Sequence, residues 1–342
     1  MAKYLKYTLF MSTLLVALFL GNIFCGSVDI PSKEVLNILC GGEAAKESWK
    51  FIILDSRLPQ AITALLSGPA LAVCGLLLQT YFNNPLAGPS ILGINSGASL
   101  GVAVVMLIMG GSVGVGALNF TGFLAVLVGA IIGSLLVMAI LLLFSSFVKG
   151  NLTLLIIGIM VGYLTSSAIS LLNFFATTEG VHSYVIWGMG TFGGVSSAQL
   201  PYFSITVLIG LVASVLMIKP LNALLLGERY AENLGVNIRK IRNLILLTVG
   251  LLTACVTAFC GPIAFIGLAV PHISRLLIGS SNHTTLLPFT LLTGAVMALL
   301  CNLSCILPGN GGILPLNAIT PLLGAPVIIY VLVNQRKIQY FN

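Results

Sequence analysis

The sequence predicts an all-α polytopic membrane protein with about ten transmembrane helices and an inverted internal repeat. Three observations lead to this prediction: a very apolar composition, apolar runs that recur along the whole chain, and internal similarity between the two halves. Only 7% of the residues are charged and 58% are hydrophobic, whereas a soluble enzyme of this length needs far more charge to cover its surface. The net charge of +7 is therefore expected as a Lys/Arg excess on the inner side of a lipid bilayer, and no nucleic-acid binding is expected.

The first apolar run, Leu9–Phe24, follows Lys3 and Lys6 and is similar to a signal peptide. No small-residue cleavage site follows it, so we interpret it as an uncleaved span with its N-terminus inside. Residues 26–57 carry much of the remaining charge. They are expected to form an external loop that contains a short amphipathic piece near residues 32–40.

Nine further apolar segments are long enough to cross the hydrocarbon core as helices. They cover residues 58–82, 91–109, 120–147, 151–175, 198–218, 243–262, 263–279, 286–306 and 317–334. The even number of spans places both termini on the inner, cytoplasmic side, and the basic residues agree with this topology. The inner set is Lys3, Lys6, Lys149, Lys219, Arg229, Arg239, Lys240, Arg242, Arg336 and Lys337, and the outer set is Lys33, Lys46, Lys50 and Arg57.

Glycine and proline patterns refine the picture of these spans. Glycines that recur every fourth residue predict faces on which helices pack closely. They are Gly93, Gly97 and Gly101, then Gly129 and Gly133, then Gly158 and Gly162. Prolines such as Pro85, Pro262 and Pro271 interrupt other spans. At membrane depth such breaks either border a transport path or only kink a helix for packing.

An internal repeat relates the two halves of the chain, about 1–190 and 191–342, within a single transmembrane domain 1–342. A shift of 186 residues aligns pairs of identical residues that include several Gly and Pro positions. They are Leu65-Leu66 with Leu251-Leu252, Ala72 with Ala258, Cys74-Gly75 with Cys260-Gly261, Pro85 with Pro271, and Gly93 with Gly279. In the topology above, the span near 58 runs inward and its counterpart near 243 runs outward. The halves are therefore expected to be inverted, a common plan for proteins that alternate access.

One charged island, residues 219–242, separates two long apolar arms and holds five of the 15 Lys/Arg residues. Residues 228–234 are expected to form a short helix that Gly235 closes in a left-handed conformation, with Tyr230, Ala231 and Leu234 near one face. Such a loop either docks onto a soluble cytoplasmic partner or only marks the inner side and solvates a connector.

The chain lacks the motifs of common catalytic classes. It contains no GxxxxGK[ST] phosphate loop and no HExxH, so no catalytic residue and no cofactor bound by this chain are expected. No Asp or Glu lies within the predicted spans, and Glu179 falls in the loop between spans five and six. Because an ion-driven carrier usually keeps an intramembrane carboxylate, this absence favours energy supplied from outside the chain.

No metal site is expected either, since the seven cysteines follow no metal-binding spacing. Two pairs remain to be weighed, Cys301 with Cys305 on one helix face and Cys25 with Cys40 outside the membrane. His272 and Arg275 lie one helical turn apart. We expect His272 to be a packing or hydrogen-bonding residue and Arg275 to snorkel to the inner interface.

Several motifs together resemble the FecCD transport family, the permease subunits of ABC importers for cobalamin, ferric siderophores and haem. The resemblance covers essentially the whole length, and its most specific pieces are Asn84-Pro85-Leu86-Ala87 and GPIAFIGLAVPHISR at 261–275. The remaining pieces are Arg57-Leu58-Pro59, Gly68, Gly75, Gln79, Pro89, Leu92-Gly93, Ser96-Gly97-Ala98, Trp187-Gly188-Met189-Gly190, Leu226-Gly227-Glu228, Ala231, Leu234-Gly235-Val236, Pro288, Leu314-Pro315 and Leu323-Gly324-Ala325-Pro326.

The resemblance implies a homodimer of ten-helix subunits in a bacterial cytoplasmic membrane, with the translocation path between the subunits. It also implies two ATP-binding subunits on the cytoplasmic side, which use the ATP, and an extracytoplasmic substrate-binding protein. The loop 219–242 then carries the helix that couples to the ATPase. The coupling residues implied are Gly227, Glu228, Arg229, Ala231, Leu234, Gly235 and Val236.

The chain departs from the family pattern at positions expected on the outer face. Gln60 takes the place of a second basic residue in the opening R-x-P-R motif, and Asn302 and Ile306 replace an Asp and an Arg. Arg57 alone is therefore expected to dock the binding protein. For the translocation path we select polar residues of the spans: Gln79, Asn84, Ser166, Ser167, Asn173, Asn317 and Thr320.

These observations favour one functional class over two others. The leading interpretation is a permease subunit of an ATP-driven importer for an iron-siderophore, haem or cobalamin-type metal chelate. The alternative is an ion-coupled secondary transporter with inverted repeats, against which the missing intramembrane carboxylate counts. A membrane-embedded enzyme lacks any catalytic constellation to support it.

Overall fold

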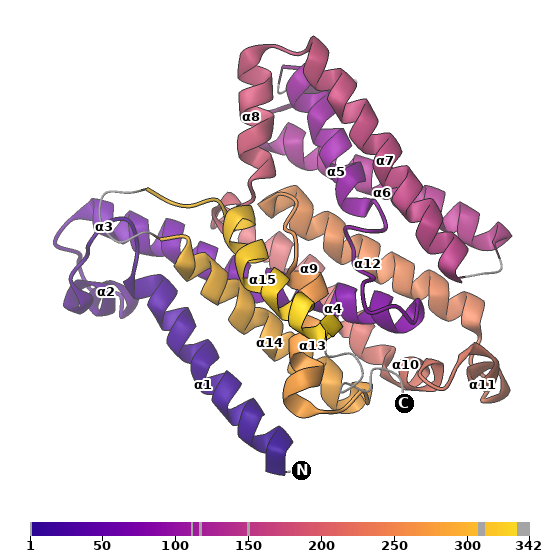
Figure 1. Ribbon diagram of the computed structural model, residues 1–342. Coiled ribbons are helices and arrows are strands. Elements are labelled where there is room, and N and C mark those ends of the chain that lie inside the picture. Colours follow the sequence, from indigo (N-terminus) through magenta and orange to yellow (C-terminus); the bar gives the residue numbers. More distant parts are fainter. Residues whose placement is uncertain (1, 111, 116–117, 149–150, 307–311, 334–342) are drawn as a thin grey trace.

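The computed structural model describes residues 2–110, 112–115, 118–148, 151–306 and 312–333, and these are almost entirely helical (Figure 1). The long helices are α1 (Ala2–Phe24), α4 (Leu58–Tyr81), α6 (Phe123–Phe147), α7 (Asn151–Phe175), α9 (Leu200–Leu216), α12 (Ile238–Cys260), α14 (His283–Ser304) and α15 (Leu316–Val333). The shorter elements are α2 (Ser32–Leu39), α3 (Glu47–Phe51), η1 (Ile52–Arg57), α5 (Ile94–Ala103), η2 (Val104–Ile108), β1 (Ser112–Val115), β2 (Leu118–Thr121), α8 (Thr178–Gly188), η3 (Phe192–Gly194), α10 (Ile218–Leu224), α11 (Glu228–Asn233) and α13 (Ile266–Ile278).

The apolar helices match the predicted spans. Among the described residues six helices are long and apolar enough to cross a membrane, and the bent pair α9 and α10, with 51° between its halves, makes a seventh. Three shorter apolar segments complete the set, Ile94–Ile108, Ile266–Ile278 and Leu316–Tyr330. The prediction of a polytopic helical fold with about ten spans is therefore confirmed.

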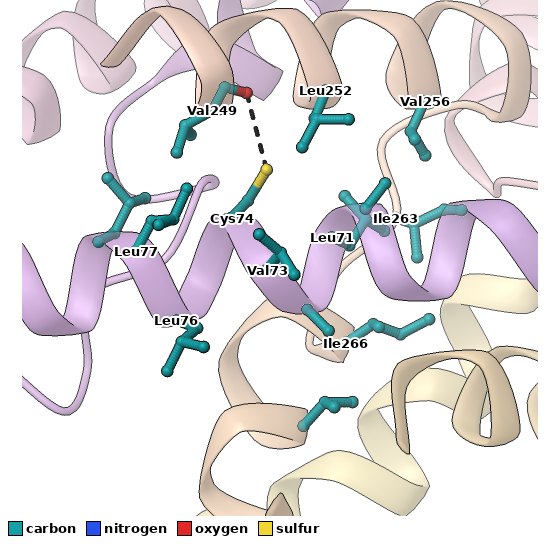
Figure 2. Packing of buried hydrophobic residues seen from close by; sticks show 14 of the residues in the cluster. Leu71, Val73, Cys74, Leu76, Leu77, Val249, Leu252, Val256, Ile263 and Ile266 are labelled. Atoms are coloured by element: carbon teal, nitrogen blue, oxygen red, sulfur yellow. Dashed lines mark hydrogen bonds between the residues drawn. The ribbon is translucent and has the colours of Figure 1, made fainter. Parts of the chain in front are cut away.

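Helix α4 lies at the centre of the bundle and contacts α9, α12, α13 and α14. Glycines allow two of these contacts to be unusually close. A Cβ added at Gly75 would lie 1.6 Å from the Gly267 carbonyl oxygen on α13, and one at Gly68 would lie 2.1 Å from that of Gly294 on α14. Branched side chains fill the remaining space, as Figure 2 shows for Leu71 of α4.

The glycine stripes of the first half also mark a helix contact, between α5 and α6. A Cβ added at Gly101 would lie 1.9 Å from the carbonyl oxygen of Gly129, and one at Gly133 would lie 2.1 Å from that of Gly97. Each glycine therefore lets the facing backbone approach, which is the packing role that the spacing predicted.

Two corresponding spans of the halves, α4 and α12, run antiparallel, as an inverted repeat requires. Ser67 Oγ lies 3.7 Å from Cys260 Sγ, and farther along α4 the Cys74 thiol donates to the carbonyl of Val249, earlier in α12 (Figure 2). The fixed shift of 186 residues does not match the helices in detail, because Cys74 lies inside α4, which ends at Tyr81, whereas Cys260 is the last residue of α12. Gly93 precedes the first turn of α5, whereas Gly279 follows the last turn of α13.

The basic residues gather at the end of the bundle that the topology assigns to the inner side. Lys3 Nζ lies close to Gly279, at the end of α13, and the island with α10 and α11 packs beside the start of α14. At the opposite end α2 and α3 form the charged external segment (Figure 1). Lys149, Arg336 and Lys337 lie outside the described residues.

Two connections contain more structure than expected. The loop between spans five and six includes α8, whose first turn is capped because Thr177 Oγ1 accepts a hydrogen bond from the Gly180 N–H (3.2 Å). Between spans three and four the antiparallel strands β1 and β2 form a hairpin. The fourth span consequently starts at Phe123 rather than at residue 120, after Gly122 with a φ of +59°.

Candidate functional site

The charged island folds into a short helical unit at the basic end of the bundle. Helix α10 continues from α9 at the 51° bend, and α11 follows after Gly227, which has a φ of +98°. Gly235, with a φ of +85°, ends α11, and its N–H donates to the carbonyl of Glu232 (2.9 Å). The predicted short helix and its left-handed closing glycine are therefore confirmed.

This unit presents apolar side chains to the outside of the bundle. Leu226, Tyr230 and Leu234 are 64%, 52% and 58% exposed, whereas Ala231 is fully buried. The expectation that Tyr230, Ala231 and Leu234 share one face is wrong, because Ala231 faces the bundle and anchors α11. Leu226, Tyr230 and Leu234 together are called the exposed apolar patch below.

A groove of about 770 Å³ runs between this unit and the end of α4. Charged residues Glu228 and Arg229 line it together with Tyr81 of α4 and Leu226. Both charged residues were predicted to couple to an ATPase. The last predicted coupling residue, Val236, closes the unit from the other side, where its N–H donates to the Ala231 carbonyl (3.0 Å).

Buried polar contacts connect the end of α4 to α13. Arg275 Nη1 donates to Gln79 Oε1 (2.6 Å), and Gln79 Nε2 donates to the Leu268 carbonyl (3.2 Å). The expectation that Arg275 snorkels to the interface is wrong, since its side chain is only 4% exposed. His272 Nε2 donates to the Pro85 carbonyl (2.7 Å), which agrees with the hydrogen-bonding role predicted for it. Gln79 thus joins helices and does not line an open path.

A second set of buried contacts joins α10, α14 and α4 through residues that the sequence did not single out. His283, fully buried at the start of α14, lies between Asn222 of α10 (Nδ1 to Oδ1, 3.0 Å) and Thr80 of α4 (Nε2 to Oγ1, 2.8 Å). The only sequence signal is a histidine at the first position of an apolar helix, directly after the N-cap Asn282.

Near the outer end, Asn317 fixes three segments to one another. Its Nδ2 donates to the carbonyls of Gly188 (2.9 Å) and Pro262 (2.7 Å), and its Oδ1 accepts from the Ala264 N–H (3.2 Å). Beside it a pocket of about 490 Å³ is lined by the end of α8, including Trp187, and the start of α15. Asn317, one of the predicted path residues, lines this pocket.

The other predicted path residues are scattered. On α7, Ser166 and Ser167 are exposed and Asn173 is half-buried, while Thr320 on α15 is buried. Asn84 lies in the turn after α4, where its Oδ1 accepts from the Leu86 N–H (2.9 Å). Helix α7 packs on α5 and α6, whereas α15 packs on α13 and α14. The two groups of path residues therefore lie on different parts of the chain (Figure 1).

Arg57, predicted to dock a binding protein, is instead buried at the outer end, with 6% of its side chain exposed. Its Nη1 donates to the carbonyls of Ile23 (3.0 Å) and Phe24 (2.9 Å), and its Nη2 donates to that of Val28. Arg57 thus satisfies carbonyl groups that the end of α1 leaves without helical partners. This position contradicts the expectation of a surface arginine.

Two of the three positions at which the chain departs from the family pattern, Gln60 and Asn302, contact each other. Gln60 Nε2 donates to Asn302 Oδ1 (3.0 Å), and Asn302 Nδ2 donates to Asn22 Oδ1 (2.7 Å). Asn302 is 6% exposed. These amides join α4, α14 and α1, so they are not free to contact an external partner.

The cysteines and other potential ligands form no cluster in the described part of the chain. Cys25 and Cys40 are exposed free thiols, so the weighed disulfide is not formed. Cys301 and Cys305 are buried, and the Cys305 thiol donates to the Cys301 carbonyl (3.1 Å). No group of three or more His, Cys, Asp or Glu side chains could hold a metal ion among these residues.

Known proteins share both the sequence and this architecture. The model of the FecCD transport family matches residues 14–334. The hemin transport system permease protein HmuU of Yersinia pestis is 33% identical over 335 residues, which cover 96% of this chain and 95% of that protein. The vitamin B12 import system permease protein BtuC of Citrobacter koseri is 34% identical over 310 residues, covering 87% and 90%.

A solved structure agrees with the sequence comparison. An inward-facing conformation of a metal-chelate type ABC transporter superposes with a TM-score of 0.82 and 30% identity, and the match covers 96% of this chain and 99% of that one. The residues that the family model matches include the charged island and the helices from α4 to α15. The chain therefore belongs to the FecCD transport family.

Proposed function

We propose that this chain is the membrane-spanning permease subunit of an ATP-driven importer for a metal chelate of the haem, cobalamin or siderophore type. The relatives described above support the proposal, since their names assign them to hemin transport and vitamin B12 import. The observation that carries it is the exposed apolar patch of Leu226, Tyr230 and Leu234, at the end of the bundle that holds the basic residues. A patch on that side fits a cytoplasmic ATP-binding partner.

The proposal includes a homodimer with the path between the two copies. Exposed apolar side chains on α7, including Leu164 at 72% and Phe174 at 80%, supply a large surface for lipid or a second copy. The separation of the path residues on α7 from those on α15 supports the second copy, because α15 of one copy and α7 of the other can then face a common space.

The orientation and the remaining partners follow from the same topology. Both termini lie on the cytoplasmic side of a bacterial cytoplasmic membrane, and ATP is used by two partner subunits and not by this chain. A substrate-binding protein delivers the chelate at the outer end, near α2 and α3. Because Arg57 is buried, we assign this docking to the exposed basic residues of that segment, Lys46 and Lys50.

The burial of the charged residues does not support the alternative function, an ion-coupled carrier. All eight Asp and Glu residues of the chain are described, and none is buried. A proton or sodium site in the membrane normally needs such a carboxylate. Among the residues that the structure describes, the buried charged side chains are those of two arginines, Arg57 and Arg275, each held by oxygen acceptors.

The test is gentle detergent purification of the chain from its native membranes, with identification of the proteins that co-elute. We expect a stoichiometric ATP-binding protein, and we expect Leu234→Glu to remove it, because a carboxylate there enters an apolar contact. Leu36→Glu is the matched control, since Leu36 is a 54% exposed leucine of α2 at the opposite end. The permease recovered without any ATP-binding protein, under conditions that keep a known importer intact, would favour the ion-coupled carrier.

A further inference from the structure

We propose that the contact between Asn222 and His283 is the joint that transmits movement of the charged island to the membrane-spanning helices. Both are then positioning residues for ATP-coupled transport. The inference rests on the proposed function, in which α11 receives the movement of the ATP-binding subunit. It adds the element that carries this movement onward, from α10 to α14 and α4.

The Asn222 side chain is held on both sides by the start of α14. Its Oδ1 accepts from the backbone N–H of His283 (2.8 Å), and this fixes the orientation of the amide, because a backbone N–H can only donate. Its Nδ2 donates to Asn282 Oδ1 (3.0 Å) and to Thr284 Oγ1 (3.4 Å). A side chain of α10 thus satisfies a donor at the N-terminus of another helix.

The hydrogen-bond pattern also fixes the tautomer of His283. Since Asn222 Oδ1 already accepts from the backbone, Nδ1 must carry the hydrogen that binds it (3.0 Å). In the neutral ring Nε2 can only accept, so the single hydrogen of the Thr80 hydroxyl points to it (2.8 Å), and the Leu76 carbonyl (2.9 Å) is the alternative acceptor of that hydrogen. His283 is fully buried, so a directed connection runs from α10 through α14 to the last turn of α4.

The connection continues into α13. Thr80 follows Gln79, whose Oε1 accepts from Arg275 Nη1 (2.6 Å). His272, one turn before Arg275, donates to the Pro85 carbonyl (2.7 Å) and so holds the turn that follows α4. If α10 is displaced, the ends of α4, α13 and α14 must move with it, or buried polar groups lose their partners.

Apolar packing alone does not provide this directional link. Leu221 and Leu224 of α10 are buried against the bundle, but contacts between methyl groups resist separation more than sliding, since dispersion has no preferred direction. Hydrogen bonds weaken steeply when their angle or length changes. The Asn222 amide is therefore the group of α10 that fixes its register on α14.

The experiment uses the complete transporter in lipid vesicles and measures cargo taken up per ATP hydrolysed, with haem, cobalamin and a ferric siderophore as separate probes. We expect Asn222→Leu to keep the ATP-binding partner and hydrolyse ATP while uptake per ATP falls about tenfold, the factor that one or two lost buried hydrogen bonds give to a conformational equilibrium. Thr80→Val removes the hydroxyl that lies against His283 and should also lower the uptake per ATP hydrolysed. This second variant tests the joint if Asn222→Leu does not fold.

Two variants serve as controls. Asn222→Asp retains the acceptor for both His283 hydrogens but loses the donor to Asn282 Oδ1 (3.0 Å), so it should restore only part of the ratio. Asn302→Leu removes a buried amide at the far end of the same helix and should lower thermal stability without changing the ratio.

If Asn222→Leu reduces uptake and hydrolysis in equal proportion, or changes neither, the joint is refuted. Wild-type protein without ATP-dependent uptake of any probe would instead overturn the proposed function.

Discussion

Buried polar side chains fasten the helices of this protein at both ends of the bundle. At the outer end, Asn22 Nδ2 donates to the carbonyls of Leu18 (2.7 Å) and Leu299 (3.1 Å), so its Oδ1 must face Asn302. Asn302 in turn accepts from Gln60 (3.0 Å). Each amide has one donor and one acceptor side, and the chain of contacts uses both.

This pairing predicts that charge is tolerated at positions 60 and 302 only when it is introduced at both. Asn302→Asp alone places a buried carboxylate against the Asn22 oxygen and should destabilise the chain, because two acceptors then face each other. Gln60→Arg in addition should restore stability by forming an ion pair. Thermal unfolding of the wild type, both single variants and the double variant should give a coupling energy of about 0.5–3 kcal/mol. Additive effects of the two substitutions would contradict the pairing.

The two buried arginines show what sequence reasoning could not reach at the level of single residues. Arg57 and Arg275 each lie near the end of an apolar run, where a long basic side chain commonly extends into the interface. Their burial depends on acceptors that come from distant segments: Ile23, Phe24 and Val28 for Arg57, and Gln79 for Arg275. Only the three-dimensional arrangement brings those acceptors within reach.

At the scale of elements, glycine geometry determines where the short surface helices end. Gly235 closes α11 with a φ of +85°, and its N–H donates to the Glu232 carbonyl (2.9 Å). Gly41 follows α2 with nearly the same geometry, a φ of +82° and an N–H that donates to the Ile38 carbonyl (3.1 Å). A Cβ at either glycine would have no atom within 4 Å, so backbone conformation alone makes a side chain unfavourable there.

Gly235→Pro should abolish uptake while the protein still inserts into the membrane. Proline requires a φ near −65° and lacks the N–H, so the end of α11 must unwind, whereas the spans do not depend on this turn. Gly41→Pro is the matched control, since it perturbs an equivalent turn at the opposite end and should leave the ATP-binding partner attached. The amount of protein in the membrane fraction, co-purification of the partner and uptake are measured together. Normal uptake by the Gly235→Pro protein would refute the docking role of α11.

Hydropathy predicted the spans well, because each must satisfy its own backbone within a helix of sufficient length. It could not predict α8, whose polar first turn, Thr178 to Val181, is similar to a loop, nor the hairpin of β1 and β2 within an apolar connection. The repeat pairs α4 with α12, but the aligned residues are not equivalent, since Cys74 lies inside α4 and Cys260 is the last residue of α12. A fixed shift misaligns the halves because it ignores the different lengths of the segments that join the helices.

At the scale of the whole molecule, one chain supplies the proposed docking unit, a tightly packed centre and two separate surfaces with the predicted path residues. α4 connects these parts, since it contacts α12, α13 and α14 along its length and ends at the island. The path residues were the least predictable, because Ser166 and Ser167 are exposed in one copy and their environment depends on what covers α7.

The source of energy is the property of the whole molecule that best separates the two transport classes. In vesicles that contain the permease, its ATP-binding partner and the binding protein, uptake should require ATP on the side of α11. It should also persist when ionophores remove proton and sodium gradients, since all eight Asp and Glu residues lack the burial of an intramembrane ion site. A non-hydrolysable ATP analogue and the Leu234→Glu protein should both give no uptake. Uptake that continues without ATP and collapses with an ionophore would assign the chain to the ion-coupled carriers, and the exposed patch on α11 would then need a different partner.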